Sequence, residues 1–278
     1  MRTDFEFVLC GADSRRLRVA AEEARAEIEA TDRELSAFSL GSLLNKVNRE
    51  AGERPVKVPG RLLELFVLCR RVYRDSGGAF DPSVAPLMEA WGFREDPERT
   101  PGAGTSSDAA SVAEQRSAVG LDALELDPAA GTVRFRRPGL QLDLGGVGKG
   151  VALDRAAEAL RDAGLGHFLL HGGSSTFLAF GAPPHQPAWR VGVRHPRDPE
   201  RVLASVELRD RALSVSGQHG RTILADGARL GHVIDPARGA PAAGELAVVT
   251  ASTAAAADAW STALLAGAAA PVSWKACA

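Results

Sequence analysis

The chain has 278 residues, of which 45% are hydrophobic and 24% charged, and its formal net charge is −2. This is the composition of a globular protein, long enough for one large domain or two closely associated ones. The near balance of charges excludes the basic surface of a nucleic-acid-binding protein, and no apolar run is long enough for a transmembrane helix.

Three cysteines, Cys10, Cys69 and Cys277, lie far apart and form no metal-binding or redox motif. We expect free thiols in a reducing compartment, with Cys69 in the core. The N-terminal apolar run is short and interrupted by Glu6, so it fits neither a secretory signal nor a lipoprotein signal. These features predict a cytoplasmic protein.

Alternating apolar residues predict a first strand over residues 5–9. Apolar positions three or four apart predict helices over residues 17–38 and 59–76, and a short helical turn lies between them. Residues 77–93 hold two prolines and three aromatic residues, which predicts a rigid loop. This loop is either pinned to the core by its aromatic rings or one wall of a ligand pocket.

Residues 94–107 are rich in Pro, Gly and Ser and predict a mobile segment, followed by a weak helix over residues 107–119. Residues 124–126 and 132–135 predict a hairpin. The remaining apolar runs predict strands over residues 140–144, 168–170, 177–180, 189–193, 202–208, 213–216 and 246–250, and helices over residues 150–163 and 253–266. Helices and strands occur in clusters rather than in strict alternation, which favours an α+β fold with mainly antiparallel sheets.

Residues 142–155, L-D-L-G-G-V-G-K-G-V-A-L-D-R, hold four glycines in six residues just before a predicted helix. Bare backbone N–H groups and a helix N-terminus could hold a phosphate, with Lys149 as the counter-charge. A tight turn that only permits close packing is an equally good interpretation. The Walker P-loop fails at Asp143 and Gly150, and the Rossmann pattern fails at Val151.

Asp258 and Thr262 lie four residues apart in an alanine-rich predicted helix, so they share one face. A carboxylate buried among apolar residues is costly unless it is paired or bound to a metal. The hard oxygens of Asp and Thr suit Mg²⁺. The alternative is an Asp near the exposed start of the helix and a Thr bonded back to its own backbone.

Five separated segments, spread over residues 3–267, together resemble the ApbE family of FAD:protein FMN transferases. In chain order they read L-S-A-F…S-L-L-N-K-V-N, G-A-F-D-P-S-V-A-P-L-M-E-A-W-G-F, L-D-L-G-G-V-G-K-G-V-A-L-D, G-H-V-I-D-P-A-R-G-A-P and A-D-A-W-S-T-A-L. The resemblance implies one flavin transferase domain over residues 1–278, with an α+β architecture and an active site between a large core and a smaller subdomain.

The implied activity is Mg²⁺-dependent transfer of FMN from FAD to a Ser or Thr hydroxyl of an acceptor protein, with release of AMP. FAD is therefore the expected substrate and the acceptor protein the expected partner. The alternatives are an FAD pyrophosphatase that yields FMN and AMP, and a non-catalytic flavin-binding protein.

The resemblance also implies roles for individual residues. The implied metal ligands are Asp258, Thr262 and the backbone carbonyl of Ala152. The implied flavin-nucleotide contacts are Phe38, Asn48, Ala79, Phe80, Asp81, Lys149, Arg155 and Val233. His232 and Asp235 match the H-x-x-D-P motif, and His232 is the expected base or the group that positions the attacking hydroxyl.

The chain departs from the family's common pattern at Ser174, Val215 and Arg238, where relatives often carry Asp, Thr and Thr. Ser261 stands where some relatives have a further acidic ligand. We expect these departures to bear on the acceptor and on turnover more than on flavin binding.

Overall fold

The structure is a computed structural model that describes residues 3–94, 109–218, 222–225 and 228–270. It divides into two compact units, each assembled from separate stretches of the chain. Unit 1 comprises Met1–Ser36, Gly145–Ser216 and Ala247–Ser261, and unit 2 comprises Ala37–Leu144, Gly217–Leu246 and Thr262–Ala278. The chain passes from one unit to the other several times. One of these passages lies within the glycine-rich segment, between Leu144 and Gly145, and another lies within the last described helix, between Ser261 and Thr262.

A five-stranded sheet forms the centre of unit 1, in the order β1-β5-β6-β9-β14. The strands are β1 (Phe5–Leu9), β5 (Phe168–Gly172), β6 (Thr176–Phe180), β9 (Arg211–Gly217) and β14 (Leu246–Ala251). β5 lies antiparallel to both β1 and β6, and β6 lies antiparallel to β9. Phe168, Leu170 and Leu178 point to the same side and are buried, as the alternating pattern predicts.

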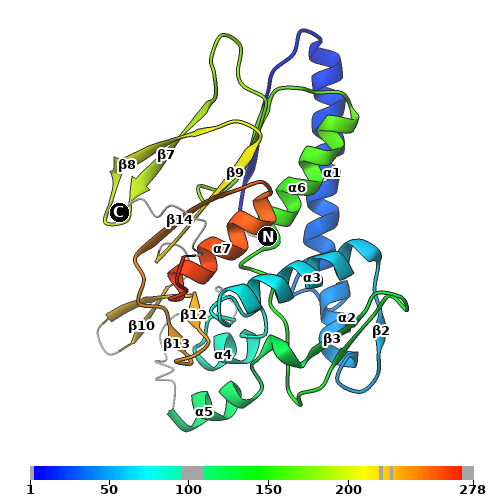
Figure 1. Cartoon of the computed structure of the whole chain (residues 1–278), viewed down its shortest axis with the longest axis vertical. Coiled ribbons are helices and arrows are strands. Elements are labelled where there is room, and N and C mark those ends of the chain that lie inside the picture. The colour runs from blue at the N-terminus through cyan, green and yellow to red at the C-terminus, as the bar shows by residue number, and fades with distance from the viewer. Residues whose placement is uncertain (1–2, 95–108, 219–221, 226–227, 271–278) are drawn as a thin grey trace. The chain divides into compact units, whose positions relative to one another are not determined.

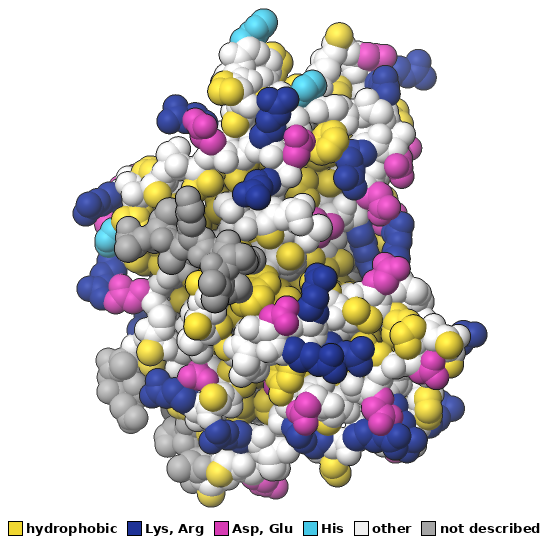
Figure 2. Space-filling view, in the orientation of Figure 1, with side chains coloured by type: hydrophobic (Ala, Val, Ile, Leu, Met, Phe, Trp, Pro, Cys, Tyr) yellow, Lys and Arg dark blue, Asp and Glu magenta, His cyan; other side chains and the backbone are white. Residues whose placement is uncertain are grey.

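Two long helices accompany this sheet, α1 (Ser14–Leu35) and α6 (Gly148–Asp162). α6 contacts β5 and β6, and α1 packs along α6 (Figure 1). α1 begins three residues before the predicted start because the Asp13 carboxylate accepts the N–H groups of Arg15 and Arg16 at 2.9 and 3.1 Å. Basic and acidic side chains alternate on its outer side (Figure 2), where Arg25 pairs with Glu22 and Glu29.

Unit 1 also carries a two-stranded antiparallel ribbon, β7 (Trp189–His195) paired with β8 (Asp198–Leu208). Trp189, Val191 and Val193 bury one side of β7. The final helix, α7 (Ala254–Leu265), has its residues 254–261 in unit 1 and its last four in unit 2.

Unit 2 is built around α3 (Gly60–Asp75), which contacts the short helix η1 (Leu121–Ala123) and the edge of a three-stranded sheet. The sheet has the order β2-β4-β3, with β2 (Val56–Lys57), β4 (Thr132–Phe135) and β3 (Leu124–Asp127). The predicted hairpin is β3–β4, and Cys69 is buried on α3 as expected. α2 (Leu43–Glu50) starts at Ser42, whose hydroxyl accepts the Asn45 N–H.

A second cluster in unit 2 joins two helices to short strands. These elements are α4 (Ala85–Ala90), α5 (Ala109–Ser117), β10 (Thr222–Ala225), β11 (Ala228–Gly231), β12 (Ile234–Asp235) and β13 (Ala240–Pro241). Leu87, Phe93 and Ile234 form its core, and the indole of Trp91 donates to the Gly239 carbonyl at 2.9 Å. Phe93 and Trp91, two of the three aromatic residues of the predicted rigid loop, therefore lie in or against this core.

Two predicted elements were wrong. Residues 140–144 form no strand and make only an isolated bridge between Gln141 and Val84. Residues 77–93 are not all loop, because they contain α4, which starts with a proline in its first turn. Residues 95–108, which include all but the first residue of the predicted mobile segment, and Cys277 lie outside the described residues. No helix within the described ranges is long and apolar enough to cross a membrane.

Candidate functional site

Asp258 is the most deeply buried carboxylate of unit 1, with 2% of its surface exposed. It lies in the second turn of α7, among the buried residues Ala255, Ala259 and Trp260. The interpretation of Asp258 as an exposed residue near a helix start is therefore wrong. A carboxylate in such surroundings needs partners.

Both oxygens of Asp258 have partners from other elements of unit 1. Oδ1 accepts from the Ser214 hydroxyl on β9 at 3.3 Å and from the Thr176 hydroxyl on β6 at 3.5 Å. Oδ2 accepts the backbone N–H of Gly150 at 3.1 Å, and the Lys149 Nζ lies 3.7 Å from Oδ1. Burial raises the pKa of the Asp258 carboxyl, and Lys149 and the three hydrogen-bond donors oppose that rise.

The glycine at position 150 is required by close packing against α7. A Cβ atom built there would lie 2.3 Å from the carbonyl oxygen of Ala254, closer than any such contact in real structures. The absent side chain lets the first turn of α6 approach the start of α7 and present its N–H to Asp258. Gly150 therefore has two roles: it permits close packing of α6 against α7, and its N–H donates a hydrogen bond to the Asp258 carboxylate.

Asp154 joins the same two helices from the other side. Its Oδ1 accepts the N–H of Ala254 at 2.7 Å, and its Oδ2 accepts the N–H of Ala255 at 2.9 Å. Burial raises the pKa of Asp154 to about 6, with the charge of Asp258 adding to the rise and the two N–H groups and Arg161 opposing it. In the sequence, Asp154 is the last residue of the glycine-rich motif L-D-L-G-G-V-G-K-G-V-A-L-D, but nothing there indicates that it caps another helix.

Ser261 extends the contacts of Asp258 into a chain of hydroxyl groups. Its Oγ lies 3.0 Å from the Ser214 Oγ, 3.0 Å from the Asp258 carbonyl oxygen and 2.8 Å from the Ser216 Oγ. Ser261 and Ser214 are fully buried. Where some relatives have a further acidic ligand, this chain thus has the neutral hydroxyl of Ser261, which contacts Ser214 and the Asp258 backbone.

The other two implied metal ligands lie on the same helices as these groups. Thr262 is half-buried and follows Asp258 by one turn of α7. Ala152 is fully buried in the second turn of α6, where its carbonyl faces the N–H of Ala156 in the helix pattern. Only the second lone pair of the Ala152 carbonyl is therefore available to a cation.

Arg155 connects α6 to α1. Its Nη1 lies 2.6 Å from the Glu34 Oε2 and 3.1 Å from the Thr31 hydroxyl. The side chains of Arg155 and Glu34 are 10% and 19% exposed, so this ion pair is largely shielded from water. The partners of Arg155 in the structure are thus two residues of α1.

In unit 2, Asn48 binds the backbone at the entrance of the glycine-rich segment. Its amide group donates to the Leu142 carbonyl at 2.9 Å and accepts the Leu142 N–H at 2.8 Å. These two bonds replace those that a neighbouring strand would make. They occupy both backbone polar groups of Leu142, so this residue needs no strand partner.

Phe80 and Asp81 point into the interior of unit 2. Phe80 is 3% exposed, and the Asp81 carboxylate accepts the N–H and hydroxyl of Ser83 at 2.8 and 2.6 Å. The Ser83 hydroxyl in turn accepts the Gly120 N–H at 2.7 Å. Burial raises the pKa of Asp81, and the bonds from Ser83 oppose that rise. Ala79 is half-buried.

Phe38 is the opposite case, with 53% of its surface exposed. The Arg94 guanidinium lies 5.9 Å from the centre of its ring, within the range of a cation–π contact. An exposed aromatic ring of this size offers an apolar face to a planar ligand.

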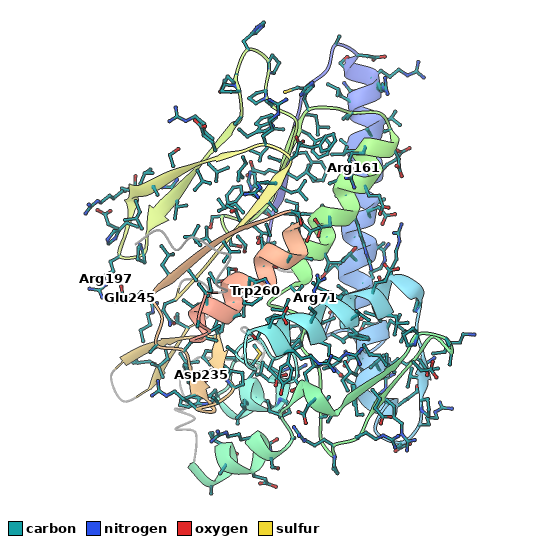
Figure 3. All side chains as sticks on the ribbon, viewed as in Figure 1. Arg71, Arg161, Arg197, Asp235, Glu245 and Trp260 are labelled. Atoms are coloured by element: carbon teal, nitrogen blue, oxygen red, sulfur yellow. The ribbon has the colours of Figure 1, made fainter. Side chains whose placement is uncertain are left out.

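The H-x-x-D-P motif runs through the short strand β12 into the turn that joins β12 to β13. The Asp235 carboxylate (Figure 3) accepts the N–H groups of Ala237 and Arg238 at 2.9 and 3.2 Å. The Val233 carbonyl accepts the Ala242 N–H at 2.8 Å, and His232 is half-buried just before it. Asp235 therefore closes the turn after β12 as an Asx turn does, and His232 lies three residues before it.

Sequence reasoning missed three polar groups that contact these helices: Thr176, Ser214 and Asp154. Thr176 and Ser214 are buried polar residues in strands whose neighbours are apolar, which is the signal that could have singled them out. Their common partner lies on α7, far away in the sequence, so no local pattern reveals it.

Comparison with known proteins places these features in context. The sequence profile of the ApbE family matches residues 1–274. The chain is 32% identical to the FAD:protein FMN transferase of Klebsiella pneumoniae (strain 342) over 270 residues, which cover 95% of this chain and 76% of that protein. It is 30% identical to the FAD:protein FMN transferase of Escherichia coli (strain K12), with the same coverage.

Solved structures agree on the fold. The crystal structure of the ApbE protein from Thermotoga maritima superposes with a TM-score of 0.82 at 26% identity and covers 95% of this chain and 87% of that one. The flavin transferase ApbE from Vibrio cholerae has a TM-score of 0.79 at 24% identity, with 96% and 84% covered. The mixed α+β fold with antiparallel sheets is confirmed.

Proposed function

The chain belongs to the ApbE family, and from this premise we propose that it transfers FMN from FAD to a Ser or Thr hydroxyl of an acceptor protein. Relatives named for this activity match almost the whole chain, which supports a transferase with FAD as its substrate. The structural observation that carries the proposal is the buried Asp258 carboxylate, which accepts hydrogen bonds from neighbouring elements and lies near the Lys149 ammonium.

The proposed reaction is a displacement at the flavin-side phosphorus of the FAD pyrophosphate. The acceptor oxygen forms a new bond to that phosphorus, and the bond from this phosphorus to the bridging oxygen breaks. The bridging oxygen leaves with AMP, and the hydroxyl proton passes to a base. The acceptor thus gains FMN less one molecule of water.

We propose Mg²⁺ as the resident cation, held by Asp258, Thr262 and the backbone carbonyl of Ala152. These are hard oxygen donors, and a carboxylate whose pKa is raised by burial gains from an added positive charge. Within the described residues no group of three or more His, Cys, Asp and Glu side chains gathers, so Asp258 would be the single charged ligand. When bound, Mg²⁺ would offset the negative charge that develops on the leaving phosphate.

We also propose the flavin-nucleotide contacts that the family resemblance implies. The exposure and the bonding partners of these residues differ. The exposed ring of Phe38 suits the isoalloxazine, and the Lys149 ammonium, on a side chain that is 25% exposed, suits a phosphate. Ala79 and Val233 are half-buried beside the inward-pointing Phe80 and the Asp235 turn.

Asn48 and Asp81 have their polar groups engaged by the protein itself, and Nη1 of Arg155 is paired with Glu34. We propose that Asn48 and Asp81 act mainly by holding the backbone that contacts the nucleotide, and that Arg155 holds α6 against α1.

We propose His232 as the group that accepts the proton of the attacking hydroxyl or positions it. Imidazole exchanges protons near neutral pH, and the bond from the Ala242 N–H to the Val233 carbonyl fixes the backbone next to this residue.

The test uses a synthetic peptide library in which a single Ser or Thr is flanked by randomised residues. The protein is incubated with FAD and Mg²⁺, with and without the library, and AMP and peptide masses are measured. The proposal predicts library-dependent AMP release and flavin-bearing peptides. AMP release without any modified peptide would instead identify an FAD pyrophosphatase, and tight FAD binding without AMP would identify a carrier.

A further inference from the structure

We infer that Asp154 is a positioning residue for the Asp258 site, because it caps α7 and thereby fixes where Asp258 meets α6. The inference deepens the proposed function and rests on it for the identity of the cation. Asp154 itself need not touch the cation or the substrate, because its contacts are with the backbone of α7.

α6 and α7 cap each other at their N-termini. The first N–H groups of any helix have no partner within the helix and need an acceptor from outside. Val147, which precedes α6, provides no side-chain cap, and the Asp258 carboxylate accepts the Gly150 N–H instead. Asp154 in return accepts the N–H groups of Ala254 and Ala255 at the start of α7.

The spacing within the two helices is the same. Asp154 follows Gly150 by four residues, and Asp258 follows Ala254 by four residues, so in each helix the aspartate and the capped backbone share one face. The backbones meet between them, where Gly150 has no room for a Cβ atom against Ala254. Three contacts therefore fix one helix against the other, and Asp258 lies one turn from the contact that Asp154 makes.

Removing the Asp154 carboxylate would leave two N–H groups of α7 without their acceptor at this contact. The third, that of Ala256, would still be capped by the Thr253 hydroxyl at 3.2 Å. α7 would therefore persist as a helix, but its first turn would lose the attachment to α6. Asp258 would then no longer be held with Oδ2 against Gly150.

The chain provides a matched control in Asp13. Its carboxylate also accepts two N–H groups at the start of a helix of unit 1, those of Arg15 and Arg16. Both of these N–H groups belong to α1, and the Asp13 side chain is exposed. Asp13→Ala thus removes the same kind of cap, and any effect that it shares with Asp154→Ala is a general consequence of losing a helix cap.

The first measurement is the affinity for Mn²⁺, used as a paramagnetic substitute for Mg²⁺ and followed by the resonance of free Mn²⁺. Loss of a group that orients a ligand typically weakens metal affinity about 10- to 100-fold, and we expect a rise in Kd of this size for Asp154→Ala. Asp154→Asn keeps one acceptor oxygen and should fall between Asp154→Ala and wild type. Asp13→Ala should bind Mn²⁺ as wild type does.

The second measurement needs neither metal nor FAD. Hydrogen exchange of the Gly150 amide, followed by NMR, reports directly on its bond to Asp258. We expect faster exchange in Asp154→Ala and unchanged exchange in Asp13→Ala. If Asp154→Ala does not fold, Asp154→Asn replaces it in both measurements.

The two readouts separate this inference from the proposed function. If wild type binds no Mn²⁺, the metal proposal fails, and the Gly150 amide alone decides whether Asp154 positions Asp258. Wild-type Mn²⁺ affinity in Asp154→Ala, or Gly150 exchange as slow as in wild type, would overturn the inference.

Discussion

The Asp258 carboxylate is buried in the interior of unit 1. Burial makes the ionised form costly, and Gly150, Ser214 and Thr176 each donate a hydrogen bond that offsets part of the cost. The sequence predicted that Asp258 shares a helix face with Thr262, because that follows from helix periodicity. It did not predict the donors, because they come from three other elements that only the tertiary fold brings to α7.

Replacing this carboxylate tests its role without changing its shape. Asp258→Asn removes the charge that would hold a divalent cation, and metal-assisted charge stabilisation contributes several kcal/mol. We therefore expect AMP release from FAD to fall about 100-fold or more and Mn²⁺ binding to be lost. Asp162→Asn, at the exposed end of α6, is the control and should keep both. Full activity of Asp258→Asn would exclude Asp258 as a metal ligand.

The raised pKa of Asp81 makes a prediction about pH. Its folded pKa lies above the unfolded value of 3.8, so the folded state holds this proton more tightly than the unfolded state. The contribution of Asp81 to stability is therefore fully present below about pH 3.8 and is lost as the pH rises through the folded pKa. Asp81→Asn removes this titration.

Thermal unfolding of both proteins from pH 4 to pH 7.5 measures the effect. The Tm of wild type should decline relative to that of Asp81→Asn over this range. A difference that stays constant, or that grows in favour of wild type with rising pH, would show that the Asp81 carboxylate is not penalised by burial.

At the scale of elements, periodicity and helix-end signals predicted the helices well. α3 ends before Gly77 and α6 ends before Gly164, and both glycines adopt a positive φ. The prediction failed where a side chain replaced a strand, as Asn48 does at Leu142. It also failed where a proline began the helix α4 rather than a loop, and where the strands β10 to β13 were too short for a pattern.

The contact between α6 and α7 gives a prediction about stability. Gly150→Ala places a Cβ atom against the backbone of Ala254, and such overpacking costs about 1–3 kcal/mol. Gly60→Ala is the control, because Gly60 is also helical and a Cβ atom there has no neighbour within 4 Å. Chemical denaturation should show Gly150→Ala destabilised and Gly60→Ala neutral or slightly stabilised. Equal stability of both variants would contradict the close approach of the two helices.

At the scale of the whole molecule, the fold class was predictable and the division into units was not. Clusters of alternating and helical patterns indicated an α+β fold, as the solved relatives confirm. Each unit combines three separate stretches of chain, so no linker or change in composition marks a boundary. The function came from the order of five motifs, since none of the individual residues identifies a flavin reaction by its chemistry alone.

The most direct test of the proposed transfer is the stoichiometry of its two products. Wild type is incubated with FAD, Mg²⁺ and the Ser/Thr peptide library, and AMP and peptide-bound flavin are quantified over the same time course. The account predicts that the two products rise together in equal amounts and that neither forms with Asp258→Asn. AMP that rises without peptide-bound flavin, or flavin transfer that persists in Asp258→Asn, would contradict it.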